Sequence, residues 1–223
     1  MTILALDTAS EIFSIALGTE RGLFTFAAEA GNSHSEILCD AVESVLRCAC
    51  IERDAISLTA CMRGPGSFSG LRIGFAFAKG LSLALGKPYV SAPTLECIAY
   101  THRNFRGLVI PLLDAKQKRF FCGLYREGEA LTENLDIDAE ALAARIPPNI
   151  PVLLTGPAAS LAFERLGNTA GFEEQRFIID SAARAGNARD LLNVITEQVT
   201  LNKSILSTGD DDFSAPDYAR PAV

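Results

Sequence analysis

Residues 63–74 read Arg-Gly-Pro-Gly-Ser-Phe-Ser-Gly-Leu-Arg-Ile-Gly, and no other stretch of the chain is as informative about its fold. An apolar run, residues 56–62, precedes this loop, and an apolar helical pattern, residues 71–85, follows it. Glycines lack a Cβ atom, so they allow positive φ or close approach to another group. A glycine-rich turn before a helix presents free N–H groups and a positive dipole end, which suit an anion such as phosphate. The stretch is not a P-loop, because no Gly-Lys-Ser/Thr follows it, and the alternative is a tight strand-to-helix turn.

The composition predicts a globular protein of one large or two small domains. Of the 223 residues, 48% are hydrophobic, and the net charge is −7. An acidic chain lacks the broad positive face that autonomous binding to RNA or DNA needs. Any contact with nucleic acid would therefore depend on a partner that supplies positive charge.

The chain carries the features expected of a cytoplasmic protein. No basic segment with a small-residue cleavage site precedes the first apolar run, which argues against a signal peptide. The most apolar window, residues 71–85, contains two basic residues and is too short to span a bilayer. The six cysteines include no C-x-x-C pair and predict buried thiols in a reducing compartment instead of a disulfide or zinc site. They are Cys39, Cys48, Cys50, Cys61, Cys97 and Cys122.

The first half of the chain reads as three antiparallel strands followed by a helix. Apolar runs at residues 3–6, 12–17 and 23–28 are separated by turn-forming residues. Ser33 and Glu36 then form a candidate capping box at a helix start. The apolar residues behind it follow the period of one helix face.

A similar order begins again near residue 108, which suggests a duplicated α/β unit. An apolar run at 108–113 reaches Asp114, as the run at 3–6 reaches Asp7, and Gly156-Pro157 echoes Gly64-Pro65. Further on, residues 187–201 predict a helix that Asn187 caps. The expected halves are residues 1–106 and 107–205, with the tail 206–223 docking back on the first half.

Four strings, in this order and spacing, resemble the TsaB (YeaZ) family of bacterial relatives of TsaD. They are Leu4-Ala5-Leu6-Asp7-Thr8-Ala9, Ser33-His34-Ser35-Glu36, residues 63–74, and Pro216-Asp217-Tyr218-Ala219-Arg220. The resemblance implies the actin-like ATPase fold of two ribonuclease H-like halves. One departure concerns the turn at Asp114-Ala115-Lys116-Gln117, where the family has Gly-Glu before an aromatic strand and this chain has Lys118-Arg119.

The resemblance also implies a role in making threonylcarbamoyladenosine beside the tRNA anticodon. The family pattern makes the chain a non-catalytic scaffold for a TsaD-like catalytic subunit, with a TsaE-like ATPase as a further partner. The scaffold forms a homodimer when TsaD is missing, and tRNA is reached through the complex. No cofactor is expected on the chain alone, whereas the wider complex uses ATP and Mg²⁺. The alternative is an ATPase or small-molecule kinase of the same fold that acts alone, and a metallopeptidase ranks third.

The loop and the first turn form the candidate cofactor site, interpreted as a vestigial phosphate loop. Asp7 would organise magnesium through water, or it would instead cap its own turn, and we favour the cap. No catalytic residue and no metal ligand set is predicted, because His34 and His102 lack a second histidine at helical spacing. The candidate residues are Asp7, Thr8, Gly64, Gly66, Ser67 and Gly70.

The helix after the loop predicts a partner interface, because its apolar residues point in nearly every direction. A helix that is apolar all round is buried on every side, by a partner or by another part of its own chain. The preceding helix adds apolar residues to the same neighbourhood. The predicted interface residues are Leu38, Val42, Val45, Leu71, Phe75 and Leu81.

Overall fold

The computed structural model describes residues 1–31, 33–180, 187–201 and 216–217. Two compact units divide the chain. Unit 1 contains Met1–Thr94 and Ala185–Asp217, and unit 2 contains Leu95–Arg184 and Tyr218–Val223. This division differs from the predicted boundaries at 106 and 205, because the chain returns to the first unit before its last described helix. Of the predicted docking tail, the structure describes only residues 216 and 217.

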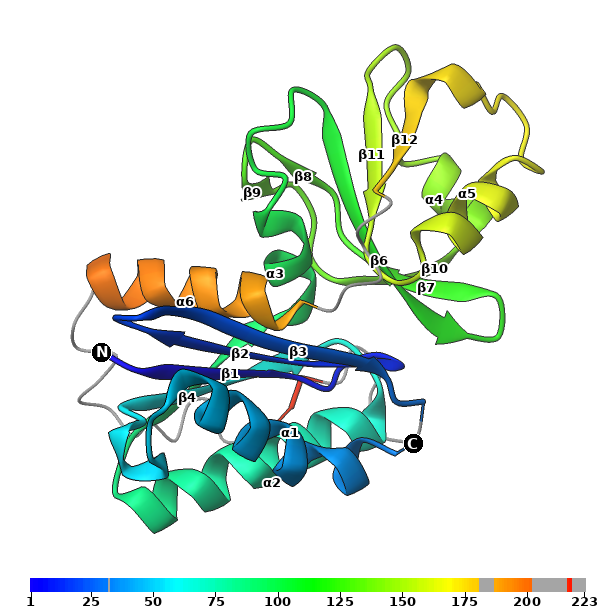
Figure 1. Cartoon of the computed structure of the whole chain (residues 1–223). Helices are drawn as coiled ribbons and strands as arrows, with labels where there is room; N and C mark the ends of the chain where they lie inside the picture. The colour runs from blue at the N-terminus through cyan, green and yellow to red at the C-terminus, as the bar shows by residue number, and fades with distance from the viewer. Residues whose placement is uncertain (32, 181–186, 202–215, 218–223) are drawn as a thin grey trace. The chain divides into compact units, whose positions relative to one another are not determined.

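Unit 1 is a five-stranded sheet in the order β3-β2-β1-β4-β5. The first three strands are antiparallel neighbours, whereas β4 runs parallel to both β1 and β5. The strands are β1 (Ile3–Asp7), β2 (Ile12–Thr19), β3 (Gly22–Glu29), β4 (Leu58–Gly64) and β5 (Tyr89–Pro93). Helices α1 (His34–Ala49) and α2 (Phe68–Leu85) cover one face, and α6 (Ala188–Leu201) covers the other (Figure 1). A short 3₁₀ turn, η1 (Arg53–Ala55), precedes β4.

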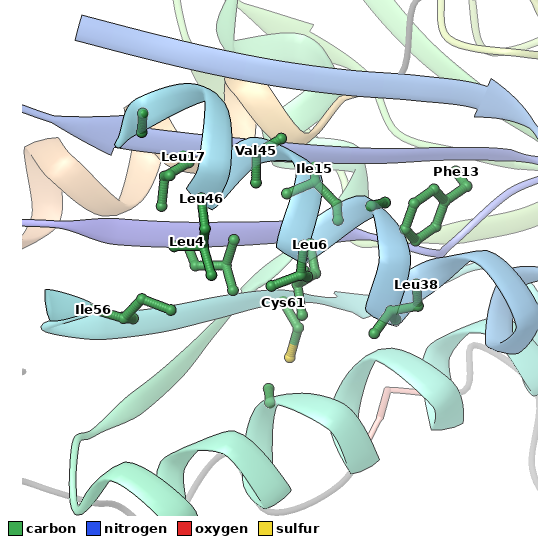
Figure 2. Close-up of a cluster of buried hydrophobic side chains, with 14 of the residues drawn as sticks. Leu4, Leu6, Phe13, Ile15, Leu17, Leu38, Val45, Leu46, Ile56 and Cys61 are labelled. Carbon is green, nitrogen blue, oxygen red and sulfur yellow. The ribbon is translucent and has the colours of Figure 1, made fainter. Parts of the chain in front are cut away.

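The core of unit 1 follows from the period of two along each strand. Leu4, Leu6, Phe13, Ile15 and Leu17 point to the face that α1 and α2 cover, and all five are buried (Figure 2). Side chains at the alternate positions, among them Asp7 and Ser14, therefore face α6. Burying apolar side chains on both faces fixes the register of the central strands.

Unit 2 repeats this strand arrangement. Its main path is β10-β7-β6-β11-β12, in which β6, β11 and β12 are parallel and β7 is antiparallel to its neighbours. The strands are β6 (Leu108–Lys116), β7 (Arg119–Cys122), β10 (Leu135–Asp138), β11 (Val152–Thr155) and β12 (Phe177–Ile179). A side hairpin, β8 (Tyr125–Arg126) and β9 (Glu129–Ala130), pairs with β6.

Helices lie on both faces of the second sheet as well (Figure 1). They are α3 (Thr94–Tyr100), α4 (Ala139–Ala143), α5 (Ala159–Leu166) and the 3₁₀ turn η2 (Glu174–Arg176). Helices α4 and α5 pack on one core cluster, and α3 packs on another. When the main-path strands of each unit are counted in chain order, both sheets have the spatial order 3-2-1-4-5. Two such sheets, each covered by helices, form the actin-like ATPase fold of two ribonuclease H-like halves. The predicted fold class and its duplication are confirmed.

Local details differ from two predictions. Ser33 precedes α1 but makes no side-chain cap bond, so the capping box is wrong. Asn187 directly precedes α6, and its side-chain amide donates to Asp7 at the end of β1. Three cysteines are buried, as predicted, whereas Cys39, Cys48 and Cys50 are exposed on and just after α1.

Candidate functional site

The turn between β1 and β2 is the point where the distinctive sequence strings meet. Asp7, the last residue of β1, is only 1% exposed. Its Oδ1 accepts the Ala9 N–H at 3.0 Å, which is the predicted cap of its own turn. Its Oδ2 accepts two N–H groups of Asn187, from the backbone at 3.0 Å and from the side chain at 3.2 Å. Desolvation by burial raises the pKa of Asp7, although these hydrogen bonds act in the opposite direction.

The glycine loop is packed against this turn. The Ser67 N–H donates to the Ala9 carbonyl at 2.7 Å, and the Ser67 hydroxyl caps α2 by accepting the Gly70 N–H at 3.2 Å. A Cβ atom on Gly70 would overlap the carbonyl oxygen of Thr8, and one on Gly66 would lie 2.5 Å from the carbonyl oxygen of Ala9. The glycines are therefore required for close approach of α2 to the turn.

The second string reaches the same turn, and the fourth meets the start of the glycine loop. His34, the first residue of α1, is 3% exposed, and its Nε2 lies 2.8 Å from the Ser10 carbonyl oxygen. His34 is thus buried within unit 1 instead of facing solvent. At the end of β4, the Asp217 N–H donates to the Arg63 carbonyl at 2.7 Å. We call this set of contacts around residues 7–10 the turn cluster.

The turn cluster does not fit the magnesium nucleotide that the fold family implies. Three N–H groups already occupy one lone pair of Asp7 Oδ1 and both lone pairs of Oδ2 in a buried setting, which disfavours binding of a hydrated cation. The faces of Gly66 and Gly70 are filled by Ala9 and Thr8 instead of being open to a phosphate. The same contacts give each of these residues a structural task, so a vestigial phosphate loop is not needed to explain the glycines.

Most of the predicted interface residues lie in the core of unit 1. Leu38, Val42 and Val45 of α1 are 2–4% exposed, and Leu71 and Phe75 of α2 are at most 4% exposed. Figure 2 labels Leu38 and Val45 within the same buried cluster as the strand residues. The prediction is wrong for these five residues, because the strongest apolar stripe of a helix marks the side that packs on its own sheet. Leu81 is partly buried against the same core.

A different face of α2 is apolar and exposed. Leu83 is 85% exposed and Phe68 is 50% exposed. Ala76, Gly80 and Ala84 are exposed as well. We call these five residues the α2 outer face. Arg72, one turn after Phe68, is also exposed, and its guanidinium lies 3.7 Å from the Phe68 ring centre.

Helix α2 is long and apolar enough to cross a membrane by length and composition alone. A helix of a protein core passes the same test. Here Leu71, Phe75 and Ala78 are buried in the core of unit 1, so one side of α2 belongs to the α/β layers. The structure gives α2 18 residues, three more than the predicted window.

Unit 2 holds a small polar cluster at the carboxyl ends of β11 and β12. Asp180 Oδ2 lies 2.9 Å from Nε2 of His102 and accepts the Thr155 hydroxyl at 2.9 Å. Asp114 caps its own turn by accepting the Lys116 N–H at 2.8 Å, as Asp7 does in unit 1. Among the described residues, no group of three or more His, Cys, Asp or Glu side chains is placed to hold a metal ion.

Known proteins resemble both the sequence and the fold. The family model of TsaD, tRNA N6-adenosine threonylcarbamoyltransferase, matches residues 27–172. The tRNA threonylcarbamoyladenosine biosynthesis protein TsaB of Bacillus subtilis is 32% identical over 177 residues, which cover 77% of each chain. TsaB of Escherichia coli is 30% identical over 131 residues, covering 58% of this chain and 57% of that protein.

A solved structure shares the fold over nearly the whole length. It is a Pseudomonas aeruginosa protein described as similar to peptidase YEAZ, with a TM-score of 0.78 and 22% identity, covering 98% of this chain and 99% of its own. At this identity the likeness concerns the fold alone. The Bacillus subtilis relative and the family model, which spans more than half of the sequence, show that the chain belongs to the TsaB (YeaZ) family of tRNA threonylcarbamoyladenosine biosynthesis proteins.

Proposed function

We propose that this chain is a non-catalytic subunit that binds a TsaD-like catalytic partner through the α2 outer face. The observation that carries the proposal is the exposure of Leu83 and Phe68 on a helix whose exposed residues from 76 to 84 include no charge. Apolar side chains that gather on one helix face are typical of a protein–protein interface. Small residues at 76, 80 and 84 would let a partner helix approach closely.

The turn cluster supports the non-catalytic part of the proposal. The carboxylate that would serve an ATPase of this fold is buried and caps a helix, and the glycine loop is filled by the chain itself. The chain therefore binds no cofactor on its own, and ATP with Mg²⁺ acts elsewhere in a complex that includes a TsaE-like ATPase. Its acidic charge fits contact with tRNA through that complex and not alone. The setting of such a complex is the cytoplasm.

A recess beside the α2 outer face would extend the interface. A cavity of about 740 Å³ lies between the end of α1 and the end of α2, and Leu46, Ile51 and Leu85 contribute its apolar lining. Arg53 and Glu43 form an ion pair at its rim. An apolar side chain of the partner would fill this recess while its polar groups meet the charged rim.

Affinity measurement with a TsaD-like protein tests the proposal. Leu83→Glu should weaken the complex at least tenfold, because a charge would be buried in the contact. The matched control is Leu201→Glu on α6, another exposed leucine in the same unit, which is 80% exposed and should change nothing. Unchanged affinity of a folded Leu83→Glu variant would contradict the proposed interface.

Calorimetric titration of the isolated chain with Mg-ATP tests the alternative, since micromolar binding would favour an ATPase or kinase that acts alone. We also propose that the isolated chain forms a homodimer through α2, which the Leu83→Glu variant should lose.

A further inference from the structure

Strand β3 forms a long, open edge of the unit 1 sheet. Its eight residues pair with β2 without interruption, from Ile12 opposite Glu29 to Thr19 opposite Gly22. On its other side, β3 has no neighbour among the strands of the described residues. The other terminal strands of the two main paths are shorter, since β5, β10 and β12 have five, four and three residues.

The free edge of β3 lacks the features that usually prevent pairing. Natural edge strands carry lysine, proline or a bulge, or they are very short. Residues 22–28 read Gly-Leu-Phe-Thr-Phe-Ala-Ala, with no charge and no proline. Strand β5, at the opposite edge of this sheet, ends in Pro93 and meets β4 with an irregular register. The contrast between β3 and β5 indicates that the free edge of β3 is available for pairing with another strand.

The hairpin shows which backbone groups of β3 face outward. Thr19 pairs with Gly22 across a two-residue loop, so those two residues exchange both hydrogen bonds. At the other end, the Ala30 N–H donates to the Glu11 carbonyl at 3.0 Å. By alternation, Gly22, Phe24, Phe26 and Ala28 bond to β2. The N–H and C=O groups of Leu23, Thr25, Ala27 and Glu29 therefore point to the free edge.

We propose that two copies of this chain pair along β3, antiparallel and centred on Thr25, to form a continuous ten-stranded sheet. A twofold axis at Thr25 places residue 23 opposite residue 27 of the partner copy, and every outward N–H then meets an outward C=O. The backbone of the segment is thus complementary to itself about this axis.

Aromatic side chains favour the same register. Phe24 and Phe26 lie on the α1 side of the sheet and are only partly buried. With Thr25 on the axis, Phe24 faces Phe26 of the partner copy in a non-hydrogen-bonded pair, where opposed Cα atoms are about 4.5 Å apart. Such aromatic cross-strand pairs stabilise sheets.

Sedimentation of the full-length chain over a wide concentration range tests this pairing. The Leu83→Glu background removes association through the α2 outer face, so the result does not depend on the proposed function. Thr25→Pro deletes the two N–H groups at the axis without breaking a bond inside the protomer, because this N–H points outward. Self-association should weaken by about tenfold or more. The matched control, Thr25→Val, keeps the N–H and should associate normally.

Amide hydrogen exchange gives an independent test. Amide hydrogen exchange at Leu23, Thr25 and Ala27 should slow as the protein concentration rises. The proposal fails if the Leu83→Glu variant stays monomeric at all concentrations, or if Thr25→Pro associates like Thr25→Val. It also fails if these amides become protected only when a TsaD-like chain is added, because the edge would then receive a strand of that protein.

Discussion

Asp7 and Ser14 stand opposite each other across β1 and β2, and together they hold the start of α6. Asp7 accepts the Asn187 N–H and Ser14 accepts the Ala188 N–H, both at 3.0 Å. The first N–H groups of a helix have no partner inside the helix. A pair of side chains from the sheet thus supplies the cap that residues next to the helix would ordinarily provide. These two hydrogen bonds attach the start of α6 to the sheet of unit 1.

Removal of the Asp7 carboxylate should therefore destabilise unit 1. Asp7→Ala leaves the Asn187 and Ala9 N–H groups without acceptors in a buried place, and we expect a loss of about 2 to 4 kcal/mol in the free energy of unfolding. Ser14→Ala removes one cap bond and should cost about 1 kcal/mol. Urea unfolding measures both values. An Asp7→Ala variant whose free energy of unfolding is unchanged would contradict the role of Asp7 as a cap.

The raised pKa of Asp7 predicts how stability depends on pH. Because burial lifts the folded pKa above the ordinary value of 3.8, the folded state binds a proton more readily than the unfolded state. The contribution of Asp7 is then greatest in acid and decreases as the pH rises from 3.8 towards the folded pKa.

Asp7→Asn cannot titrate, so it provides the reference for this effect. The difference in unfolding free energy between the natural chain and Asp7→Asn should shift in favour of the variant as the pH rises through that window. Urea unfolding at a series of pH values measures it. A shift in the opposite direction would mean that hydrogen bonding outweighs desolvation at this carboxylate.

The fold could be predicted from the sequence because its signals are local. Apolar runs of period two and their turns gave β1, β2 and β3, and the Asp7 and Asp114 turns were recognised as equivalent. Both carboxylates accept the N–H two residues later, which is a short-range contact that a sequence can reveal. The partners of Asp7 at Asn187 could not be predicted, because they are 180 residues away.

The interface was misplaced for a physical reason. Periodicity identifies the side of a helix with the most large apolar residues, and in α1 and α2 that side packs on the sheet. On α2 the outer side is apolar too, but it consists mainly of Ala76, Gly80 and Ala84 with Leu83. Only the position of the sheet in the structure shows which apolar side of α2 is buried and which is exposed. The exposed side of α1, by contrast, carries charged residues such as Asp40, Glu43 and Arg47.

Two truncations on α2 should separate its inner and outer sides. Phe75 is 4% exposed and packs in the core, so Phe75→Ala should lower the unfolding free energy by about 3 to 5 kcal/mol. Leu83 is 85% exposed, and Leu83→Ala should stay within about 0.5 kcal/mol. Thermal or urea unfolding of the isolated chain gives both numbers. Similar losses for the two variants would mean that Leu83 is covered.

The hairpin between β6 and β7 carries conformational strain that one substitution should relieve. Gln117 and Lys118 form its two-residue loop with φ of 51° and 63°. A loop with positive φ at both positions favours asparagine and glycine. Lys118→Gly should therefore raise the unfolding free energy by about 1 kcal/mol. The control Arg126→Gly, at an exposed strand position of β8, should lower it, and a loss for Lys118→Gly would contradict the strain.

Two glycines of α2 should respond in opposite ways to the same added methyl group. At Gly70 the new Cβ would overlap the Thr8 carbonyl, which is backbone and cannot move aside without displacing the turn cluster. Gly70→Ala should therefore destabilise the fold by more than about 2 kcal/mol. At Gly80 no atom outside the helix backbone lies within 4 Å of the new Cβ, and Gly80→Ala should stabilise by about 0.5 to 1 kcal/mol through helix propensity. Because both residues belong to one helix, helix propensity alone predicts a gain at both. A stabilised Gly70→Ala variant would show that α2 does not press against the turn, and the structural explanation of the glycine loop would then be wrong.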